Sequence, residues 1–435
     1  MCRPLCRKEC FQKTYRFRHS LVIQLSPNHH LVAIALKSLK QDHLRTNSNS
    51  GSACRQALAQ CGNVEAIITN ARIVTGTEVI LGSMQVKDGK ISDIARKGTA
   101  DVGALDFEGD YLLPGLVDVH TDHLEKQIMP RAGVFWNKVN AVRTQDAVLA
   151  AGGITTVFDS LIVGAVGNPD RRKLLPLMVE GLHDARQAGL LKIDHFLHLR
   201  CDTREADLVE LLKPYLGEAS LRYVTVMDDG PHRDPDRFRK LQRRKGIADE
   251  VIEEQIAAAP HTNDHAAINR AAVVALCKQH GIEFSSHDDT TAAHIAEGQA
   301  FGMTISEFPI TLESARAARA ADMTTIIGGP NIVAGRSHIG NVSGRLLSQE
   351  GLIDVICSDY IPSSILYAIW TLAGETNGPD LPAAVAMGSK RPAELFGLDD
   401  RGELAVGRRA DFLRVTEIDA APIVRNVWVE GVQIL

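Results

Sequence analysis

The sequence predicts a (β/α)8 barrel with a small β-sandwich domain that is built from both ends of the chain. Over residues 114–399, eight short apolar runs alternate with helical patterns, as expected of a parallel barrel. Over residues 63–113 and 400–435, short strand patterns with turn residues between them replace that alternation. The chain has 435 residues, which is enough for one large barrel and a small additional domain.

A doubly wound open sheet is the alternative fold for the same alternation. That fold commonly carries a Gly-x-Gly-x-x-Gly turn after an early strand when it binds a dinucleotide, and no such turn occurs at that place here. The barrel is therefore the preferred prediction.

Residues 1–62 differ in composition from the rest of the chain. They carry ten Lys and Arg residues against two acidic residues, Glu9 and Asp42, and they hold five of the eight cysteines. The cysteine spacing matches no paired Cys-x2-Cys metal template, and a clear apolar region followed by a small-residue cleavage site is lacking. We expect a poorly ordered basic extension outside the functional protein.

The overall composition narrows the functional classes and the compartment. A net charge of -5 gives no reason to expect nucleic acid or membrane partners, and no apolar run approaches the roughly 18 residues of a membrane helix. Beyond residue 62 the cysteines are Cys201, Cys277 and Cys357, too sparse for a disulfide framework. This pattern predicts a cytoplasmic protein.

The patterns in residues 63–113 and 400–435 predict the strands of one β-domain. Strand patterns cover residues 65–69, 71–74, 78–86 and 90–94, and Asp88-Gly89 is a strong hairpin signal. Similar patterns return at residues 402–404, 411–415 and 424–432. We infer that these two regions pair with each other.

The central region supplies the eight barrel strands. They are predicted at residues 116–119, 154–158, 193–199, 223–227, 282–286, 304–306, 324–327 and 354–356. Helical patterns follow, for example at residues 171–189, 206–216, 265–281, 291–302, 312–321 and 344–351. Several of these helical patterns end at glycine, a common helix stop.

The first barrel strand ends in groups that can bind a metal. The run from Leu112 to Val119 is followed by His120, Thr121 and Asp122. Residues i and i+2 of a strand point the same way, so His120 and Asp122 can converge on one point. Imidazole nitrogen and carboxylate oxygen are ordinary ligands of divalent metals. A strand end with polar groups in solvent is the simpler explanation for this pair alone.

The other strand ends carry the same kinds of residues. The set comprises Asp159, then His198, Arg200 and Asp202 on one face of the third strand, Asp228 and Asp229, His287, Asp288 and Asp289, Glu307, the loop residues Asn331, Arg336, Ser337 and His338, and finally Asp359. Chemistry in such barrels sits at the carboxyl ends of the strands. Taken together, the eight ends predict a metal-assisted hydrolase.

Several motifs resemble the amidohydrolase superfamily. They are the entry Pro-Gly-Leu-Val-Asp-Val-His at residues 114–120 and the closing Gly-Glu-Leu-Ala-Val-Gly-Arg-Arg-Ala-Asp at residues 402–411. A finer set resembles the phosphonate-metabolism branch: residues 120–126 (His-Thr-Asp-His-Leu-Glu-Lys), 129–131 (Met-Pro-Arg), 285–291 (Ser-Ser-His-Asp-Asp-Thr-Thr), 306–309 (Ser-Glu-Phe-Pro) and 358–360 (Ser-Asp-Tyr). The resemblance runs from about residue 64 to the C-terminus.

The resemblance implies a diphosphatase of the carbon–phosphorus lyase pathway. Its reaction would cleave α-D-ribose 1-methylphosphonate 5-triphosphate to the 5-phosphate and pyrophosphate. The implied cofactor is one or two divalent ions, with Zn²⁺ favoured and Mn²⁺ or Fe²⁺ as alternatives. Homo-oligomerisation and association with other phosphonate-pathway enzymes are further expectations.

The implied metal ligands are His120, Asp122, Asp202, His287 and Glu307, with Asp359 beside a bound water as base or orienting group. His338 or His198 would give a proton to the leaving group. Asp122 stands where the superfamily usually has a second histidine, and the fourth strand lacks the lysine that often bridges two metals. Asp202 is the expected bridging acid.

A phosphorylated sugar needs cationic and polar partners. Arg131, Arg200 and Arg336 are the candidates for phosphate, since Arg binds phosphate with two parallel hydrogen bonds. Asp289, Asn331 and Ser337 complete the expected substrate-binding set. The basic segment 232–245 is either a lid over the triphosphate or a solvated helix face balanced by nearby acids, and the second is slightly preferred.

Two other functions stay open at this point. One is an amidohydrolase that acts on an amide, a cyclic amide or a deaminase substrate, because fold and metal alone do not select the reaction. The other is a non-enzymatic scaffold. That reading predicts missing ligands, whereas His120, His287 and Asp359 are all present.

Overall fold

The computed structural model describes residues 66–435, apart from residues 100, 102, 263 and 338–339. The expected basic extension, residues 1–62, and the candidate proton donor His338 lie outside the described residues.

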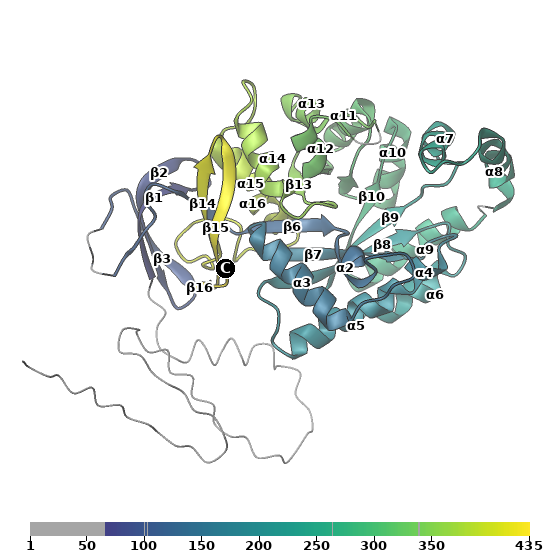
Figure 1. Ribbon diagram of the computed structural model, residues 1–435. Helices are drawn as coiled ribbons and strands as arrows, with labels where there is room; N and C mark the ends of the chain where they lie inside the picture. The colour runs from purple at the N-terminus through teal and green to yellow at the C-terminus, as the bar shows by residue number, and fades with distance from the viewer. Residues whose placement is uncertain (1–65, 100, 102, 263, 338–339) are drawn as a thin grey trace, which may run out of the picture. The chain divides into compact units, whose positions relative to one another are not determined.

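Eight parallel strands form the barrel that the sequence predicts, and helices surround it (Figure 1). In chain order the strands are β6 (Leu116–Thr121), β7 (Ile154–Val163), β8 (Asp194–Asp202), β9 (Leu221–Met227), β10 (Glu283–His287), β11 (Ile305–Glu307), β12 (Thr324–Gly328) and β13 (Val355–Cys357). Each lies beside its sequence neighbour. Backbone hydrogen bonds between the end of β6 and Asp359 bring the last strand to the first: the Asp359 N–H donates to His120 at 2.9 Å, and the Asp122 N–H donates to Asp359 at 3.1 Å.

Helices follow the strands in the expected alternation. They are α2 (Leu124–Ile128), α3 (Lys138–Ala151), α4 (Pro169–Arg172), α5 (Leu174–Gln187), α6 (Leu208–Leu212), α7 (Pro235–Arg244), α8 (Asp249–Thr262), α9 (Asp264–His280), α10 (Ala292–Phe301), α11 (Leu312–Ala320), α12 (Gly329–Ala334), α13 (Gly344–Gln349), α14 (Ser364–Ala373), α15 (Leu381–Met387) and α16 (Lys390–Leu395), with a 3-10 turn, η1, at Lys213–Tyr215. Among the described residues, no helix is long and apolar enough to span a membrane.

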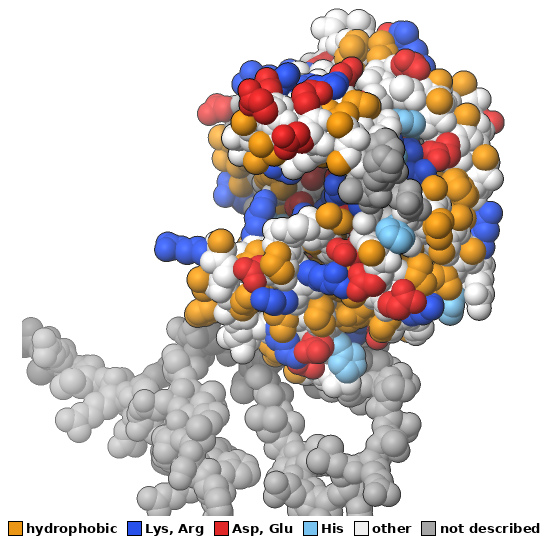
Figure 2. Space-filling model, turned by 90° about the vertical axis from the view of Figure 1, so that its right-hand side faces the viewer, with side chains coloured by type: hydrophobic (Ala, Val, Ile, Leu, Met, Phe, Trp, Pro, Cys, Tyr) orange, Lys and Arg blue, Asp and Glu red, His pale blue; other side chains and the backbone are white. Residues whose placement is uncertain are grey.

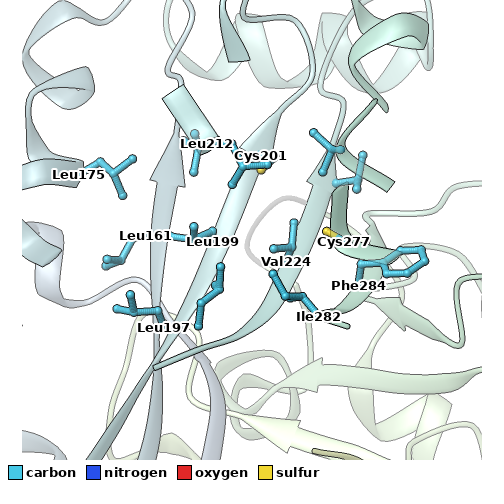
Figure 3. Close-up of a cluster of buried hydrophobic side chains, with 14 of the residues drawn as sticks. Leu161, Leu175, Leu197, Leu199, Cys201, Leu212, Val224, Cys277, Ile282 and Phe284 are labelled. Carbon is cyan, nitrogen blue, oxygen red and sulfur yellow. The ribbon is translucent and has the colours of Figure 1, made fainter. Parts of the chain in front are cut away.

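Strand β8 shows how one strand serves both the core and the site. Leu197, Leu199 and Cys201 are buried in the large apolar cluster outside the barrel, which Figure 3 shows with side chains from neighbouring strands and helices. The alternate residues His198, Arg200 and Asp202 point the other way, because successive side chains of a strand face opposite sides. Burial of the apolar set therefore fixes the direction of the polar set.

The second sheet is built from both ends of the chain, as predicted. Its strands are β1 (Ala66–Val74), β2 (Val79–Lys87), β3 (Lys90–Ala95), β4 (Leu105–Asp106), β5 (Tyr111–Pro114), β14 (Phe412–Ile418), β15 (Ala421–Val429) and β16 (Val432–Gln433). Strands β5 and β14 pair antiparallel across some 300 residues of sequence, from Pro114 with Phe412 to Tyr111 with Val415. The Asp88-Gly89 hairpin is also confirmed, since both residues have positive φ, at 52° and 73°.

Ionic contacts connect the segment before β14 to the amino end of β8. The Asp194 carboxylate accepts a hydrogen bond from Arg401 at 2.7 Å and one from Arg409 at 2.6 Å. Both arginine side chains are only 9% exposed, so these charge-assisted bonds are largely shielded from water.

Candidate active site

Three buried side chains at the carboxyl ends of the strands could hold a metal ion. His120 on β6, His198 on β8 and Glu307 on β11 place one ligand atom each so that all three atoms lie within 4.8 Å of one another. His120 Nδ1 lies 2.8 Å from Glu307 Oε1, and neither side chain is more than 1% exposed. Three such groups, drawn from three strands, meet inside the mouth of the barrel.

Strand β9 holds the Glu307 carboxylate in place. The Thr225 hydroxyl donates to Glu307 Oε2 at 2.9 Å, and the Tyr223 hydroxyl reaches Oε1 at 3.4 Å. Burial by itself raises the pKa of Glu307, but the adjacent His120 imidazole, which hydrogen-bonds to the carboxylate, outweighs that effect and lowers the pKa well below its usual range. The carboxylate is therefore ionised in a fully buried position.

Both ring nitrogens of His198 contact hydroxyl groups. Its Nδ1 lies 2.9 Å from the Ser160 hydroxyl and its Nε2 lies 2.5 Å from the Thr225 hydroxyl. Burial lowers the pKa of His198 well below its ordinary value, so the imidazole is neutral. Neutral imidazole is the form that binds metals.

Backbone strain marks the same end of the barrel. Asp288 after β10, Phe308 after β11 and Asp359 after β13 all have φ of 56°, a left-handed conformation that residues other than glycine rarely adopt. The N–H of Asp288 donates to Glu307 and that of Phe308 donates to Ile326, each at 2.9 Å. These turns let each strand end bond to the next strand and place adjacent side chains at the mouth.

A cavity of about 520 Å³ opens beside this group. Six of the expected catalytic, metal-binding and substrate-binding residues line it: Arg200, His287, Asn331, Arg336, Ser337 and Asp359. Burial raises the pKa of the Asp359 carboxyl above its ordinary value, against the opposing effect of His120. The structure therefore brings the expected base and most of the expected substrate contacts to one space.

Several buried polar atoms at this cavity or next to its lining residues have no hydrogen-bond partner among the described residues. They include Oδ1 of Asp122, both ring nitrogens of His287, and Nε and Nη1 of Arg200. Arg200 Nη1 lies 3.7 Å from Asp122 Oδ2, and His287 Nδ1 lies 3.3 Å from Asp288 Oδ2. Buried polar groups are rarely left unsatisfied. Free imidazole nitrogens and a free carboxylate oxygen fit a bound divalent ion, and free guanidinium N–H groups fit an anion.

Asn331 lies at the cavity through α12 but uses its amide on the chain itself. Its Nδ2 donates to the Val342 carbonyl at 2.9 Å, and its Oδ1 accepts from the Gly344 N–H at 3.1 Å. This residue therefore secures the loop that follows α12, next to Arg336 and Ser337.

Three predicted site residues lie away from the cavity. Arg131 lies in an exposed turn that pairs with Val134. Asp289 is fully buried, and its Oδ2 accepts hydrogen bonds from Ser286 and Ser306. Asp202 accepts two hydrogen bonds from Arg204, each at 2.8 Å, and lines a second cavity.

The basic segment 232–245 divides between two roles. On α7, the half-buried Arg239 pairs with exposed Asp236 and Glu253, and Arg243 pairs with Asp249, both exposed. Figure 2 views the side of the molecule that carries α7 and α8, where basic and acidic side chains are interspersed. Arg237, in contrast, is 13% exposed and bonds to Asp229 and Asp288, next to His287.

Sequence reasoning missed four residues that shape the site. Tyr223 and Thr225 hold Glu307 from inside β9, and the Phe308 ring packs edge-on against His120 and His287, with centroids 4.8 and 5.5 Å apart. A Cβ on Gly328 would lie 3.1 Å from Asp359 Oδ2, so glycine leaves room for that carboxylate. Two signals were available: the i, i+2 spacing of Tyr223 and Thr225, and the place of Phe308 in the motif at residues 306–309.

The fold and the buried His–His–Glu group define the class as a (β/α)8-barrel protein with metal-type ligands at its carboxyl-terminal mouth. The family model described as "Amidohydrolase family" matches residues 111–434. The chain belongs to the amidohydrolase family.

Known proteins refine this placement. The chain is 36% identical over 376 residues to α-D-ribose 1-methylphosphonate 5-triphosphate diphosphatase of Escherichia coli K12, covering 84% of this chain and 99% of the relative. Its fold is similar to that of N-acetyl-D-glucosamine-6-phosphate deacetylase from Mycobacterium smegmatis (TM-score 0.58, 16% identity, covering 85% and 99% of the two chains). It is equally similar to 5-methylcytosine deaminase from Klebsiella pneumoniae (TM-score 0.58, 18% identity, 85% and 98%). The resemblance seen in the motifs is confirmed.

Proposed function

We propose that this protein is a metal-dependent hydrolase that converts α-D-ribose 1-methylphosphonate 5-triphosphate to the 5-phosphate and pyrophosphate. The observation that carries the proposal is Arg200. Its buried guanidinium has N–H groups without a partner among the described residues, and it lies 3.7 Å from Asp122 at the mouth of the barrel. A buried free guanidinium suits a phosphate, whereas a neutral amide substrate does not need one. The E. coli relative carries that substrate in its name.

The metal would be held by His120, Glu307 and His198 or His287, with Asp122 completing the set. The unpaired nitrogens of His287 and the unpaired Oδ1 of Asp122 support this donor set. A divalent ion bound there supplies charge neutralisation at phosphate oxygens and lowers the pKa of water. Zn²⁺ is the proposed ion, since imidazole and carboxylate are its usual partners, and Mn²⁺ and Fe²⁺ are the alternatives to test.

Asp359 acts as the base in this proposal. Its carboxylate lies in the cavity, and its backbone bonds to His120 and Asp122 fix its position relative to the metal-type group. It accepts the proton of an attacking water, the water oxygen bonds to the α-phosphorus, and the bond to the β-phosphate breaks to release pyrophosphate. Either His198 or His338 was expected to give a proton to the leaving group. Neutral His198 has a single ring proton, and both of its nitrogens already contact hydroxyl groups. This favours either His338 as the donor or departure of pyrophosphate without prior protonation.

The experiment measures pyrophosphate release from the ribose 5-triphosphate with the 1-methylphosphonate, with and without Zn²⁺ or Mn²⁺. We compare the wild type with Asp359→Asn and with Asp249→Asn, which changes an exposed acid that pairs with Arg243 and lines neither cavity. Pyrophosphate release that needs metal, is lost in Asp359→Asn and is kept in Asp249→Asn supports the proposal. A protein that holds metal but releases no pyrophosphate refutes it, and cyclic amides become the next substrates to test.

The cysteines bear on where this reaction would take place. Within the described residues, Cys201, Cys277 and Cys357 are all free and buried. Free thiols in the core support the proposal of a reducing cytoplasm.

A further inference from the structure

A second cavity of about 250 Å³ adjoins the cavity of the candidate active site. Arg200 lines both cavities, and strand β8 brings Asp202 to the second one. The remaining wall comes from the carboxyl ends of β7 and β9, from the segments after β7, β8 and β9, and from α7 with the residue that follows it. The two spaces therefore meet at the residue that carries the proposed function.

The second cavity is rich in cations. Arg171, Arg200, Arg204 and Lys245 line it, against the carboxylates of Asp202 and Asp229. The larger cavity has Arg200 and Arg336 against Asp288 and Asp359. Among these lining residues, cations outnumber acids in the smaller cavity. In the larger cavity the two numbers are equal, before His287 and a bound metal are counted.

Two of these arginines are held rigidly by acids behind them. Arg171 donates from Nε and Nη2 to Glu125 at 2.9 and 3.1 Å, and Arg204 donates from the same two atoms to Asp202 at 2.8 Å each. Within the described part of the chain, neither Nη1 has a hydrogen-bond partner. Guanidinium groups fixed in this way lose little conformational entropy when they bind an anion.

We infer that the second cavity binds the pyrophosphoryl end of the substrate and then the released pyrophosphate, while the larger cavity holds the ribose with its methylphosphonate. This inference rests on the proposed function. The bond that breaks must lie beside Arg200 and the metal-type group, so the two halves of the substrate extend away from that point in two directions. Charge selects between them, because pyrophosphate carries more charge in less volume than the sugar half.

The test is calorimetric binding of inorganic pyrophosphate, orthophosphate and methylphosphonate to the metal-loaded protein. Arg204→Gln removes one anchored guanidinium, and we expect pyrophosphate to bind about 10-fold or more weakly. Lys245→Gln removes an exposed cation at the rim, with an expected loss of about 3-fold and little risk to folding. Methylphosphonate should bind Arg204→Gln and Lys245→Gln as tightly as it binds the wild type. Arg336→Gln should bind methylphosphonate more weakly and pyrophosphate as tightly as the wild type does.

Arg243→Gln is the matched control, because it removes an exposed charge from the last turn of α7, two residues before Lys245. Arg243 pairs with Asp249 and lines neither cavity. Unchanged pyrophosphate binding in Lys245→Gln and in a folded Arg204→Gln overturns the inference. It is also overturned if orthophosphate binds as tightly as pyrophosphate, or if Arg336→Gln is the variant that weakens pyrophosphate. These binding constants need no turnover, so failure of the proposed reaction would be seen separately, as absent pyrophosphate release.

Discussion

The buried contact between His195, Asp146 and Asp159 should make stability depend on alkaline pH. His195 Nδ1 lies 2.7 Å from Asp159 Oδ2 and Nε2 lies 3.3 Å from Asp146 Oδ1, and the imidazole is fully buried. Burial by itself lowers the pKa of His195, but the two carboxylates outweigh it and raise the pKa from 6.5 to about 9. The group therefore carries a positive charge in the folded protein at neutral pH.

The sign and size of the effect follow from this raised pKa. A proton held more tightly in the folded state stabilises that state below pH 6.5, and the contribution is lost as pH rises through 9. The difference between these two values corresponds to about 3 kcal/mol, to within a factor of two. Replacing His195 by Gln should remove that contribution and leave two carboxylates without a cation, so the loss at pH 6 should be at least this large.

The assay is urea unfolding of the wild type and His195→Gln between pH 6 and pH 10. The gap in the free energy of unfolding between the two proteins should narrow as pH rises towards 10. His183→Gln is the control, since His183 lies in an exposed position and should give a gap near zero throughout. A gap for His195→Gln that stays constant, or widens, would show that the imidazole is not charged in the folded protein.

Two further perturbations test the packing of the site and the attachment of the C-terminal segment. Gly328→Ala would place a Cβ 3.1 Å from Asp359 Oδ2, so the carboxylate must move by a few tenths of an ångström, and we expect kcat to fall about 10-fold at nearly unchanged Tm. Gly217→Ala, with open space around its Cβ, should change neither, and a Gly328→Ala enzyme with normal kcat would contradict the idea. Asp194→Asn weakens the contacts to Arg401 and Arg409 and should lower the free energy of unfolding by about 2 kcal/mol in urea. Asp249→Asn, which removes the charge of an exposed ion pair, is the control. A loss below about 0.5 kcal/mol for Asp194→Asn, no larger than that of the control, would show that the contacts of Asp194 contribute little.

Hydropathy patterning was sufficient for the barrel but placed the strand ends too early. All eight predicted strands exist, yet β6, β7 and β8 run two to five residues further than expected, to Thr121, Val163 and Asp202. The apolar run stops where polar side chains begin to enter the mouth of the barrel. The backbone ladder continues there, because strand pairing depends on N–H and C=O groups and not on the polarity of the side chain. His120 and Arg200 consequently lie within strands and not after them.

Most of the cavity could be anticipated because it is built from residues next to strand ends. Arg200, His287 and Asp359 follow directly from that rule. Arg131 does not, because a residue in an exposed turn has no strand to fix its direction. The contribution of Gly328 was also hidden, since a residue that acts by leaving space has no chemical signature in a sequence.

Strand β8 explains why residues on the same face of a strand need not reach the same site. His198, Arg200 and Asp202 point to the same side, but each pair of residues advances about 6.6 Å along a strand, so the first and last are about 13 Å apart. His198, deepest in the barrel, meets His120 and Glu307. Arg200 lines both cavities, and Asp202 lines the second cavity, where it anchors Arg204. The alternation along the strand decides which face a side chain points from. Its depth in the barrel is set by the register with β7 and β9, in which His198 lies opposite Ser160 and Tyr223. If β8 supplies a metal ligand, this depth favours His198 over Asp202. The same spacing leaves Asp202 free to position a cation for the anionic end of the substrate.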